Sequence, residues 1–123
     1  MGYDYNSTSD PDAVSPLQSE GIFSLTNTIA YFKAVNLNLS KTILALPYYG
    51  ILWDISIKKD ESIEAVVERK LTYSEIKKLF LENPDIKAEV DLDPISMSKV
   101  YRAAFDDYSI KEIHFDDVFT LSK

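Results

Sequence analysis

The sequence predicts a mixed α/β region in its first third, followed by a smaller unit of antiparallel strands and a helix. Residues 1–46 follow the order strand, loop, amphipathic helix, apolar strand, which is typical of a βαβ unit. In residues 95–105 mostly apolar side chains, from Ile95 to Phe105, alternate with a second and more polar set, from Ser96 to Ala104. This period of two favours an antiparallel strand. Residues 72–75 (TYSE) have the hydroxyl and carboxylate spacing of a helix capping box.

The first third is predicted to contain two strands and one helix. A short strand over residues 1–5 leads into a long polar loop that is rich in turn residues. Ser24 is a suitable N-cap, and the apolar residues after it have helical spacing to about Val35. Residues 42–46 (TILAL) form a continuous apolar run that ends at a proline, as expected of a parallel strand buried on both faces.

The remaining residues are predicted to form antiparallel structure around one helix. We expect strands over 51–57, 95–105 and 110–115, a turn at Asp106 and Asp107, a helix over 73–82, and a helix start at Asp116 and Asp117. Residues 62–70 follow an acidic turn, and their pattern fits a strand and a helix equally well.

Composition limits the classes of partner. The formal net charge of −7 over 123 residues argues against a nucleic-acid partner, whose phosphates require a basic face. No stretch approaches the roughly 20 apolar residues of a membrane span, and no signal peptide is visible. There is no cysteine, and His114 is the single histidine, so we expect no metal site and no cofactor.

Four stretches carry recognisable motifs, in this order along the chain: MGYDY, SPL, KTILALPYYG and IHFDDVFTLSK. Together they resemble glycoside hydrolase family 18, the chitinase family. In that family they correspond to the end of the sixth barrel strand, the loop after it, the seventh strand, and the segment that closes the insertion domain. Ala45 and Thr120 depart from the usual Gly and the frequent Ser, and neither position binds sugar in the family.

The resemblance implies a C-terminal portion of a (β/α)8 TIM barrel. Strand six, helix six and strand seven would occupy residues 1–50, and an inserted α+β chitinase insertion domain with antiparallel strands would occupy residues 51–115. Residues 116–123 would start barrel helix seven. The alternative is a self-contained α+β domain with an accidental similarity.

The resemblance also implies site residues. Tyr3 would donate its hydroxyl to the N-acetyl carbonyl of the substrate and orient it, which is a catalytic role, while Asp4 would bind a sugar hydroxyl. Met1 would line the floor of the −1 subsite. Three further substrate-binding candidates have packing or surface roles as alternatives: Tyr48 and Trp53, whose rings could stack on sugars, and Arg102 on the insertion domain.

The family cleaves β-1,4-linked N-acetylglucosamine polymers by substrate-assisted, retaining hydrolysis. The sugar's own N-acetyl oxygen attacks the anomeric carbon, and a Glu at the end of a D-x-x-D-x-D-x-E motif is the general acid. That motif is absent from this sequence. We therefore expect the parent to be the glycosidase and this chain alone to be inactive.

Two other functions remain open: a non-catalytic, lectin-like chitin or glycan binder, and a peptidoglycan-acting hydrolase of the same family. A stand-alone interaction module with no sugar role is a third. The expected partners are N-acetylglucosamine oligosaccharides or polysaccharides and the rest of the parent barrel, with no nucleic acid and no membrane. Exposed strand edges could also pair two copies of the chain. By family analogy, we expect an extracellular or cell-surface location.

Overall fold

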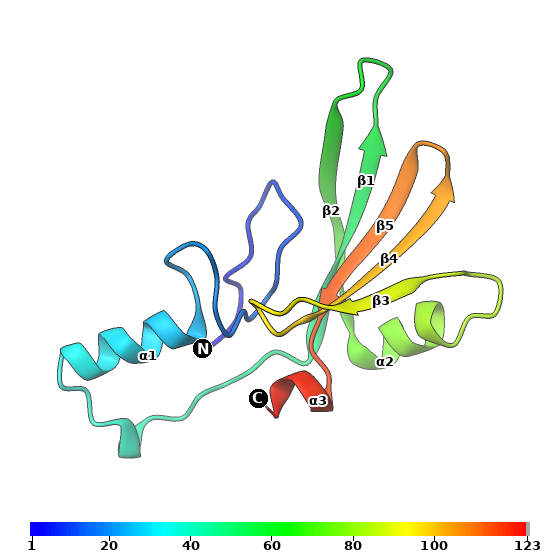
Figure 1. The fold of residues 1–123 in the computed structure, drawn as a ribbon. Coiled ribbons are helices and arrows are strands. Elements are labelled where there is room, and N and C mark those ends of the chain that lie inside the picture. The colour runs from blue at the N-terminus through cyan, green and yellow to red at the C-terminus, as the bar shows by residue number, and fades with distance from the viewer. Residues whose placement is uncertain (123) are drawn as a thin grey trace.

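The computed structural model describes residues 1–122, and its main feature is a five-stranded antiparallel sheet (Figure 1). The strand order is β2-β1-β5-β4-β3. The strands are β1 (Tyr49–Ile57), β2 (Ile63–Thr72), β3 (Glu89–Leu92), β4 (Lys99–Asp106) and β5 (Ser109–Phe115). The helical segments are α1 (Leu25–Ala34), η1 (Leu39–Lys41), α2 (Tyr73–Ile76), η2 (Lys77–Leu81) and α3 (Val118–Leu121). None of these helices is long and apolar enough to cross a membrane, as far as residues 1–122 are concerned.

One face of the sheet packs against α2 and η2, which lie beneath it in Figure 1. Leu52, Tyr101 and Ile113 come from three adjacent strands and are almost completely buried on this face. Ile76 of α2 and Phe80 of η2 close this core, and the Phe80 ring meets Tyr101 edge-on at 5.5 Å between centroids. Residues from β1, β4 and β5 therefore anchor the sheet on its helices.

The opposite face of the sheet packs against the N-terminal segment. Ile51 and Trp53 of β1 are buried there with Val14, and Tyr3 packs against the same cluster. Between Leu52 and Trp53 the pairing of β1 with β2 shifts by one residue, which is a β-bulge. The register places Glu68 opposite neither residue, so β2 has one residue more than its partner at this point.

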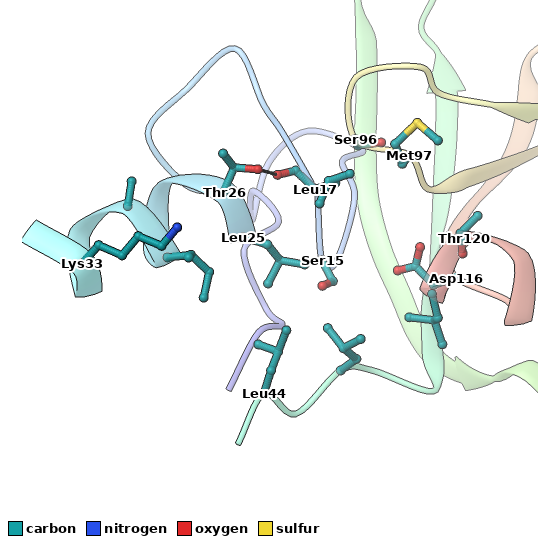
Figure 2. Close-up of a pocket in the computed structure, with 14 residues that line it drawn as sticks. Ser15, Leu17, Leu25, Thr26, Lys33, Leu44, Ser96, Met97, Asp116 and Thr120 are labelled. Atoms are coloured by element: carbon teal, nitrogen blue, oxygen red, sulfur yellow. Dashed lines mark hydrogen bonds between the residues drawn. The ribbon is translucent and has the colours of Figure 1, made fainter. Parts of the chain in front are cut away.

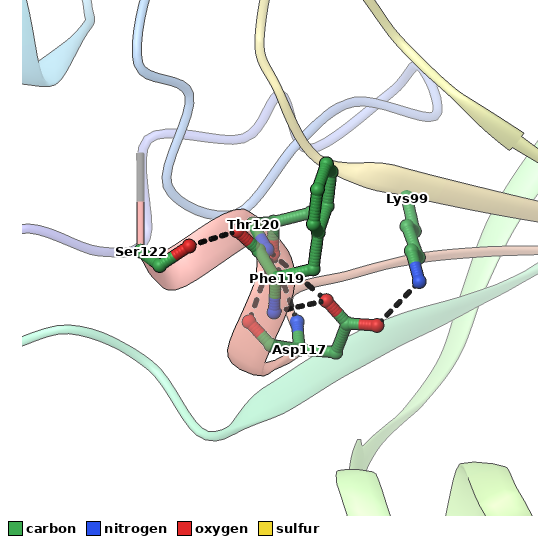
Figure 3. A network of polar contacts seen from close by, with 5 residues as sticks. All are labelled: Lys99, Asp117, Phe119, Thr120 and Ser122. Atoms are coloured by element: carbon green, nitrogen blue, oxygen red, sulfur yellow. Dashed lines mark hydrogen bonds and ion pairs between the residues drawn. The ribbon is translucent and has the colours of Figure 1, made fainter.

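Two capping boxes begin helices where the sequence predicts them. Thr72 Oγ1 accepts a hydrogen bond from the Glu75 N–H at 3.3 Å, and the Thr72 N–H donates to the Glu75 carboxylate at 2.8 Å. Asp117 caps α3 and also receives a hydrogen bond from Lys99 Nζ at 2.5 Å, which ties α3 to the start of β4 (Figure 3). These caps satisfy N–H groups that a helix start otherwise leaves unpaired.

The predicted antiparallel unit is confirmed, with differences at its boundaries. Residues 62–70, which were open between two states, belong to strand β2. The predicted strand over 95–105 begins only at Lys99, because residues 94–97 form a turn in which the Met97 N–H donates to the Asp93 carbonyl at 2.8 Å. Strand β3, which was not predicted, pairs with β4 through its polar and apolar residues alike.

The predicted barrel strands over 1–5 and 42–46 are not regular strands in this structure. The two segments meet through one hydrogen bond, from the Gly2 N–H to the Ala45 carbonyl at 2.8 Å. Burial of 42–46 on both faces is also wrong: Ile43 is 92% exposed and Leu44 is 48% exposed. The physical reason is that no strand among the described residues pairs with this segment, and a parallel strand needs neighbours to bury its apolar side chains. Lys123, the last residue of the predicted helix start, lies outside the described residues.

Candidate functional site: a tyrosine–aspartate pair beside strand β1

The N-terminal segment is held close to its surroundings by backbone contacts. The Gly2 carbonyl accepts a hydrogen bond from Ser15 Oγ at 2.5 Å, while its N–H binds Ala45. A Cβ atom at this position would lie 2.7 Å from side-chain carbons of both Leu25 and Leu44. A larger residue here would displace the ends of both leucine side chains, so the glycine lets the N-terminal segment lie close to residues 44–45.

Asp4 is the centre of a small polar cluster. Its Oδ1 accepts a hydrogen bond from the hydroxyl of Tyr49, the first residue of β1, and another from Lys70 Nζ of β2 at 2.9 Å. The Lys70 ammonium also lies 4.7 Å from the centre of the Tyr49 ring. The Tyr49 hydroxyl and then Lys70 hold the pKa of Asp4 below its ordinary value. Burial and the neighbouring Asp4 carboxylate raise the pKa of Tyr49, so its hydroxyl stays a donor.

Tyr3 and Met1 lie next to this cluster. The Tyr3 ring meets the Tyr49 ring edge-on, with 6.3 Å between centroids and an interplanar angle of 76°. The Tyr3 hydroxyl donates to the Met1 sulfur at 2.7 Å in an exposed position. The structure thus brings together three predicted site residues, Met1, Tyr3 and Asp4, around Tyr49.

The other predicted site residues lie elsewhere. Tyr48 is 74% exposed, and its carbonyl accepts a hydrogen bond from the Tyr73 N–H at 3.3 Å. Trp53 is 0% exposed and packs against Val14 and Ile51, so in this structure its ring belongs to the core and presents no face to a ligand. Their roles in sugar binding remain predictions.

Arg102 belongs to a row of polar side chains across the sheet. Its Nε donates to Glu112 Oε2 at 2.7 Å, and Glu112 Oε1 lies 2.5 Å from His114 Nε2. Burial alone would raise the pKa of Glu112, but the hydrogen bonds from His114 and Arg102 outweigh it and hold the pKa below its ordinary value. Half of the Arg102 side chain stays exposed, so it can still approach a ligand. Across residues 1–122, no three His, Cys, Asp or Glu side chains are grouped as a metal ion would require.

Two hollows lie outside the Asp4 cluster. A cavity of about 510 Å³ opens between α1, residues 44–46 and α3, with leucine side chains on several walls and Asp116 at one end (Figure 2). Burial raises the pKa of Asp116 above its ordinary value. A more polar cleft of about 770 Å³ lies between the loops of residues 5–8, 18–23 and 93–96. Neither hollow is lined by Tyr3 or Asp4.

Sequence reasoning did not single out Lys70 and Glu112 as site residues. Lys70 falls in the stretch whose secondary structure was open, so the face to which it points was unknown. The alternation of β5 places Glu112 and His114 on one face, but the sequence does not show that Arg102 lies beside them. Strand pairing between distant segments supplies both contacts.

Comparison with solved structures finds clear similarities in fold. A family GH18 chitinase from Cycas revoluta, solved in complex with (GlcNAc)3 and also with allosamidin, matches with a TM-score of 0.72 over 99% of this chain, at 20% sequence identity. A Bacillus subtilis protein assigned as the sporulation-specific glycosylase ydhD matches with a TM-score of 0.68 over 99% of the chain, at 21% identity. The C-terminal domain of a Desulfitobacterium hafniense protein assigned as a chitinase matches with a TM-score of 0.65 over 95%, at 18% identity.

These matches confirm the predicted resemblance to chitinases at the level of the fold. The chain spans about a third of the solved chitinase it matches, 35% of that chain's length. No protein-family model matches the sequence, and neither does any curated protein.

Proposed function

We propose that this chain is the substrate-positioning, C-terminal portion of a family 18 chitinase-like glycoside hydrolase. The parent would act on β-1,4-linked N-acetylglucosamine polymers by substrate-assisted, retaining hydrolysis. The chain would supply part of the −1 subsite and one wall of the cleft. The rest of the parent barrel would supply the general acid, for which this sequence has no motif.

One observation carries the proposal: the chain shares its fold over 99% of its length with a chitinase solved in complex with (GlcNAc)3. The contacts of Tyr3 and Asp4 with Tyr49 of β1 add support. The motif residues of the first segment and the start of the sheet are distant in the sequence. The contacts of Tyr3 and Asp4 with Tyr49 support the proposal that this segment and the start of β1 form one site.

The chemistry of these groups suits an N-acetylated sugar. The Tyr3 hydroxyl, directed by its ring contact with Tyr49, would donate to the N-acetyl carbonyl and orient it for attack on the anomeric carbon. To reach a substrate, this hydroxyl exchanges its exposed hydrogen bond to the Met1 sulfur, a weak acceptor, for one to a carbonyl oxygen. The ionised Asp4 would accept a hydrogen bond from a sugar hydroxyl.

The test is an NMR titration of the chain with N-acetylglucosamine oligomers. We expect chemical-shift changes at Tyr3 and Asp4, and weaker binding by Tyr3→Phe, which removes only the hydroxyl. Tyr31→Phe is the matched control, because Tyr31 is an exposed tyrosine of α1 remote from the β1 sheet. Glucose oligomers of equal length are the ligand control, since they lack the N-acetyl group.

Equal responses to both kinds of oligomer, or shifts confined to residues away from the N-terminal segment, would contradict the proposal. Hydrolytic activity is tested by combining this chain with the remaining part of the parent barrel, which would carry the general acid. We expect no hydrolysis by this chain alone, since it has no general-acid motif.

A peptidoglycan-acting hydrolase is the second candidate, and the similarity to the Bacillus subtilis sporulation-specific glycosylase favours it. Muropeptide fragments in the same titration distinguish the two substrate classes. A lectin-like, non-catalytic parent would bind the oligomers equally well and differ only in the general acid. For a parent of either kind we propose an extracellular or cell-surface location, where these polymers occur.

A further inference from the structure

We propose that Lys70, acting with the Tyr49 side chain, is a positioning residue that holds the Asp4 carboxylate so that one of its oxygens faces a sugar hydroxyl. This inference rests on the proposed function, since it concerns how the sugar-binding Asp4 is prepared for its ligand. The contacts that carry it come from three separate segments: the N-terminal segment, β1 and β2.

The register of the sheet directs Lys70 toward Asp4. Lys70 pairs with Ile51, and its neighbour Leu71 pairs with Gly50. Leu71 is 1% exposed in the core on the helix side of the sheet. Because successive side chains of a strand point to opposite faces, burial of Leu71 turns Lys70 to the face that carries the N-terminal segment.

The contacts leave one carboxylate oxygen of Asp4 available. Both the Tyr49 hydroxyl and Lys70 Nζ bind Oδ1. Oδ2 receives no hydrogen bond from the described residues, and half of the Asp4 side chain is exposed. A carboxylate oxygen in this state accepts a hydrogen bond from a hydroxyl, whereas it repels an anionic group.

The backbone at Asp4 indicates that its position is imposed by its surroundings. Its φ angle is 60°, in the left-handed region that non-glycine residues seldom occupy. Such a conformation persists where neighbouring contacts hold it, and it is often found at functional sites. Here the holding contacts are the hydrogen bonds to Tyr49 and Lys70, with Gly2 fixed two residues earlier.

The charge of Lys70 has a second effect. Its ammonium lies over the Tyr49 ring while it binds Asp4, so it stabilises the donor tyrosine and the acceptor carboxylate together. Tyr49 is the other titratable group that contacts Asp4, and burial together with the Asp4 carboxylate raises its pKa, so its hydroxyl stays a donor. Lys70 is therefore the cation that, after the Tyr49 hydroxyl, holds the pKa of Asp4 below its ordinary value.

The test compares Lys70→Met, which removes the charge, with Lys70→Arg, which keeps it. The first readout is the pKa of the Asp4 carboxyl, which is measured from its carbon NMR chemical shift as a function of pH. The second is the affinity for N-acetylglucosamine oligomers. We expect Lys70→Met to raise the Asp4 pKa and to weaken sugar binding roughly two- to fivefold, the range of an exposed ion pair, and Lys70→Arg to retain both properties.

Lys58→Met is the matched control. Lys58 forms an ion pair with Glu64 at 3.1 Å in the hairpin that joins β1 and β2. The side chains of this pair are 53% and 52% exposed, against 56% and 50% for Lys70 and Asp4. We expect this control to leave the Asp4 pKa and sugar affinity unchanged.

An unchanged Asp4 pKa and unchanged affinity in Lys70→Met would overturn the inference, as would an equal effect of Lys58→Met. A third outcome separates the two proposals. If Lys70→Met raises the Asp4 pKa but the wild-type chain binds no oligomer, the result supports positioning by Lys70 and contradicts the proposed function.

Discussion

At the scale of single residues, Gly50 shows how tightly the site's strand is packed. A Cβ atom there would lie 2.6 Å from the His114 carbonyl oxygen, 2.8 Å from Phe115 Cβ and 2.9 Å from an Ile76 carbon. β1 thus approaches β5 and α2 at a point where no side chain fits. This approach places Tyr49, the residue before it, against the N-terminal segment.

Gly50→Ala tests this packing. We expect it to lower the free energy of unfolding by about 1–3 kcal/mol, because backbone and core atoms must shift. Urea denaturation measures the loss. Gly21→Ala is the control, since its Cβ would meet nothing closer than Ser19 Oγ at 4.0 Å. Equal effects of the two substitutions would contradict the packing argument.

Glu112 predicts how the stability of the fold depends on pH. Its pKa is lower in the folded chain than in the unfolded chain, because hydrogen bonds from His114 and Arg102 outweigh the effect of burial. The stabilisation is therefore fully present above the ordinary Glu pKa and is lost as the pH falls through the lowered value. We expect Glu112→Gln to lose about 2 kcal/mol near pH 7, in the range of a hydrogen bond to a charged group, and proportionally less in acid.

The measurement is the unfolding free energy of both proteins between pH 3 and 7. A difference between wild type and Glu112→Gln that stays constant across this range would show that the carboxylate's charge has no part in the stabilisation.

At the same scale, a short motif predicts Met1, Tyr3 and Asp4 as site residues, and in the structure Tyr3 and Asp4 both contact Tyr49. The sequence did not identify Lys70, because a lysine in an exposed, charge-rich strand carries no local signal. The contact depends on strand pairing between residues 66 positions apart. Trp53 shows the reverse: an aromatic beside a predicted strand could stack on sugar or pack, and the structure buries it.

At the scale of elements, local chemistry was enough where a helix begins and insufficient where a strand needs partners. The TYSE capping box predicted the start of α2, and Thr72 and Glu75 make both of its hydrogen bonds. β2 could not be separated from a helix, because its side chains are mostly exposed on both faces and so show no clear period. β3 is only four residues long and exposed throughout, so its pairing with β4 alone defines it.

The capping box predicts the effect of Thr72→Ala. The substitution leaves the Glu75 N–H without its acceptor, so we expect a loss of about 1 kcal/mol in the free energy of unfolding. Ser74→Ala, two positions later in the same exposed turn, is the control and should have little effect. A Thr72→Ala protein as stable as wild type would show that α2 is held by Ile76 packing alone.

At the scale of the whole molecule, the sheet and the first third differ in how well they are held. The sheet has a core on each face, whereas the segment over 42–46 is irregular and exposes Ile43 and Leu44. Exposed apolar side chains of this kind favour contact with another protein surface. The proposed remainder of the barrel, or a second copy of the chain, would cover them.

Hydrogen exchange checks this difference. We expect the amides of β1, β4 and β5 to be the most protected and those of residues 42–46 to exchange quickly, because the latter lack a sheet partner. Concentration-dependent protection confined to 42–46 would indicate pairing between copies. Slow exchange of 42–46 in a dilute monomer would contradict the irregular conformation of this segment.

The bulge opposite Trp53 has a consequence for comparing relatives of this protein. Glu68 is the additional residue, so the side chains before it and after it follow opposite alternations along β2. A relative one residue shorter here would keep the lysine position that contacts Asp4, and residues 63–67 would also keep their faces, because each retains its partner on β1. An alignment gap therefore belongs at position 68. A gap placed at 71 or 72 would instead match Lys70 to the relative's counterpart of Leu71, which points into the core.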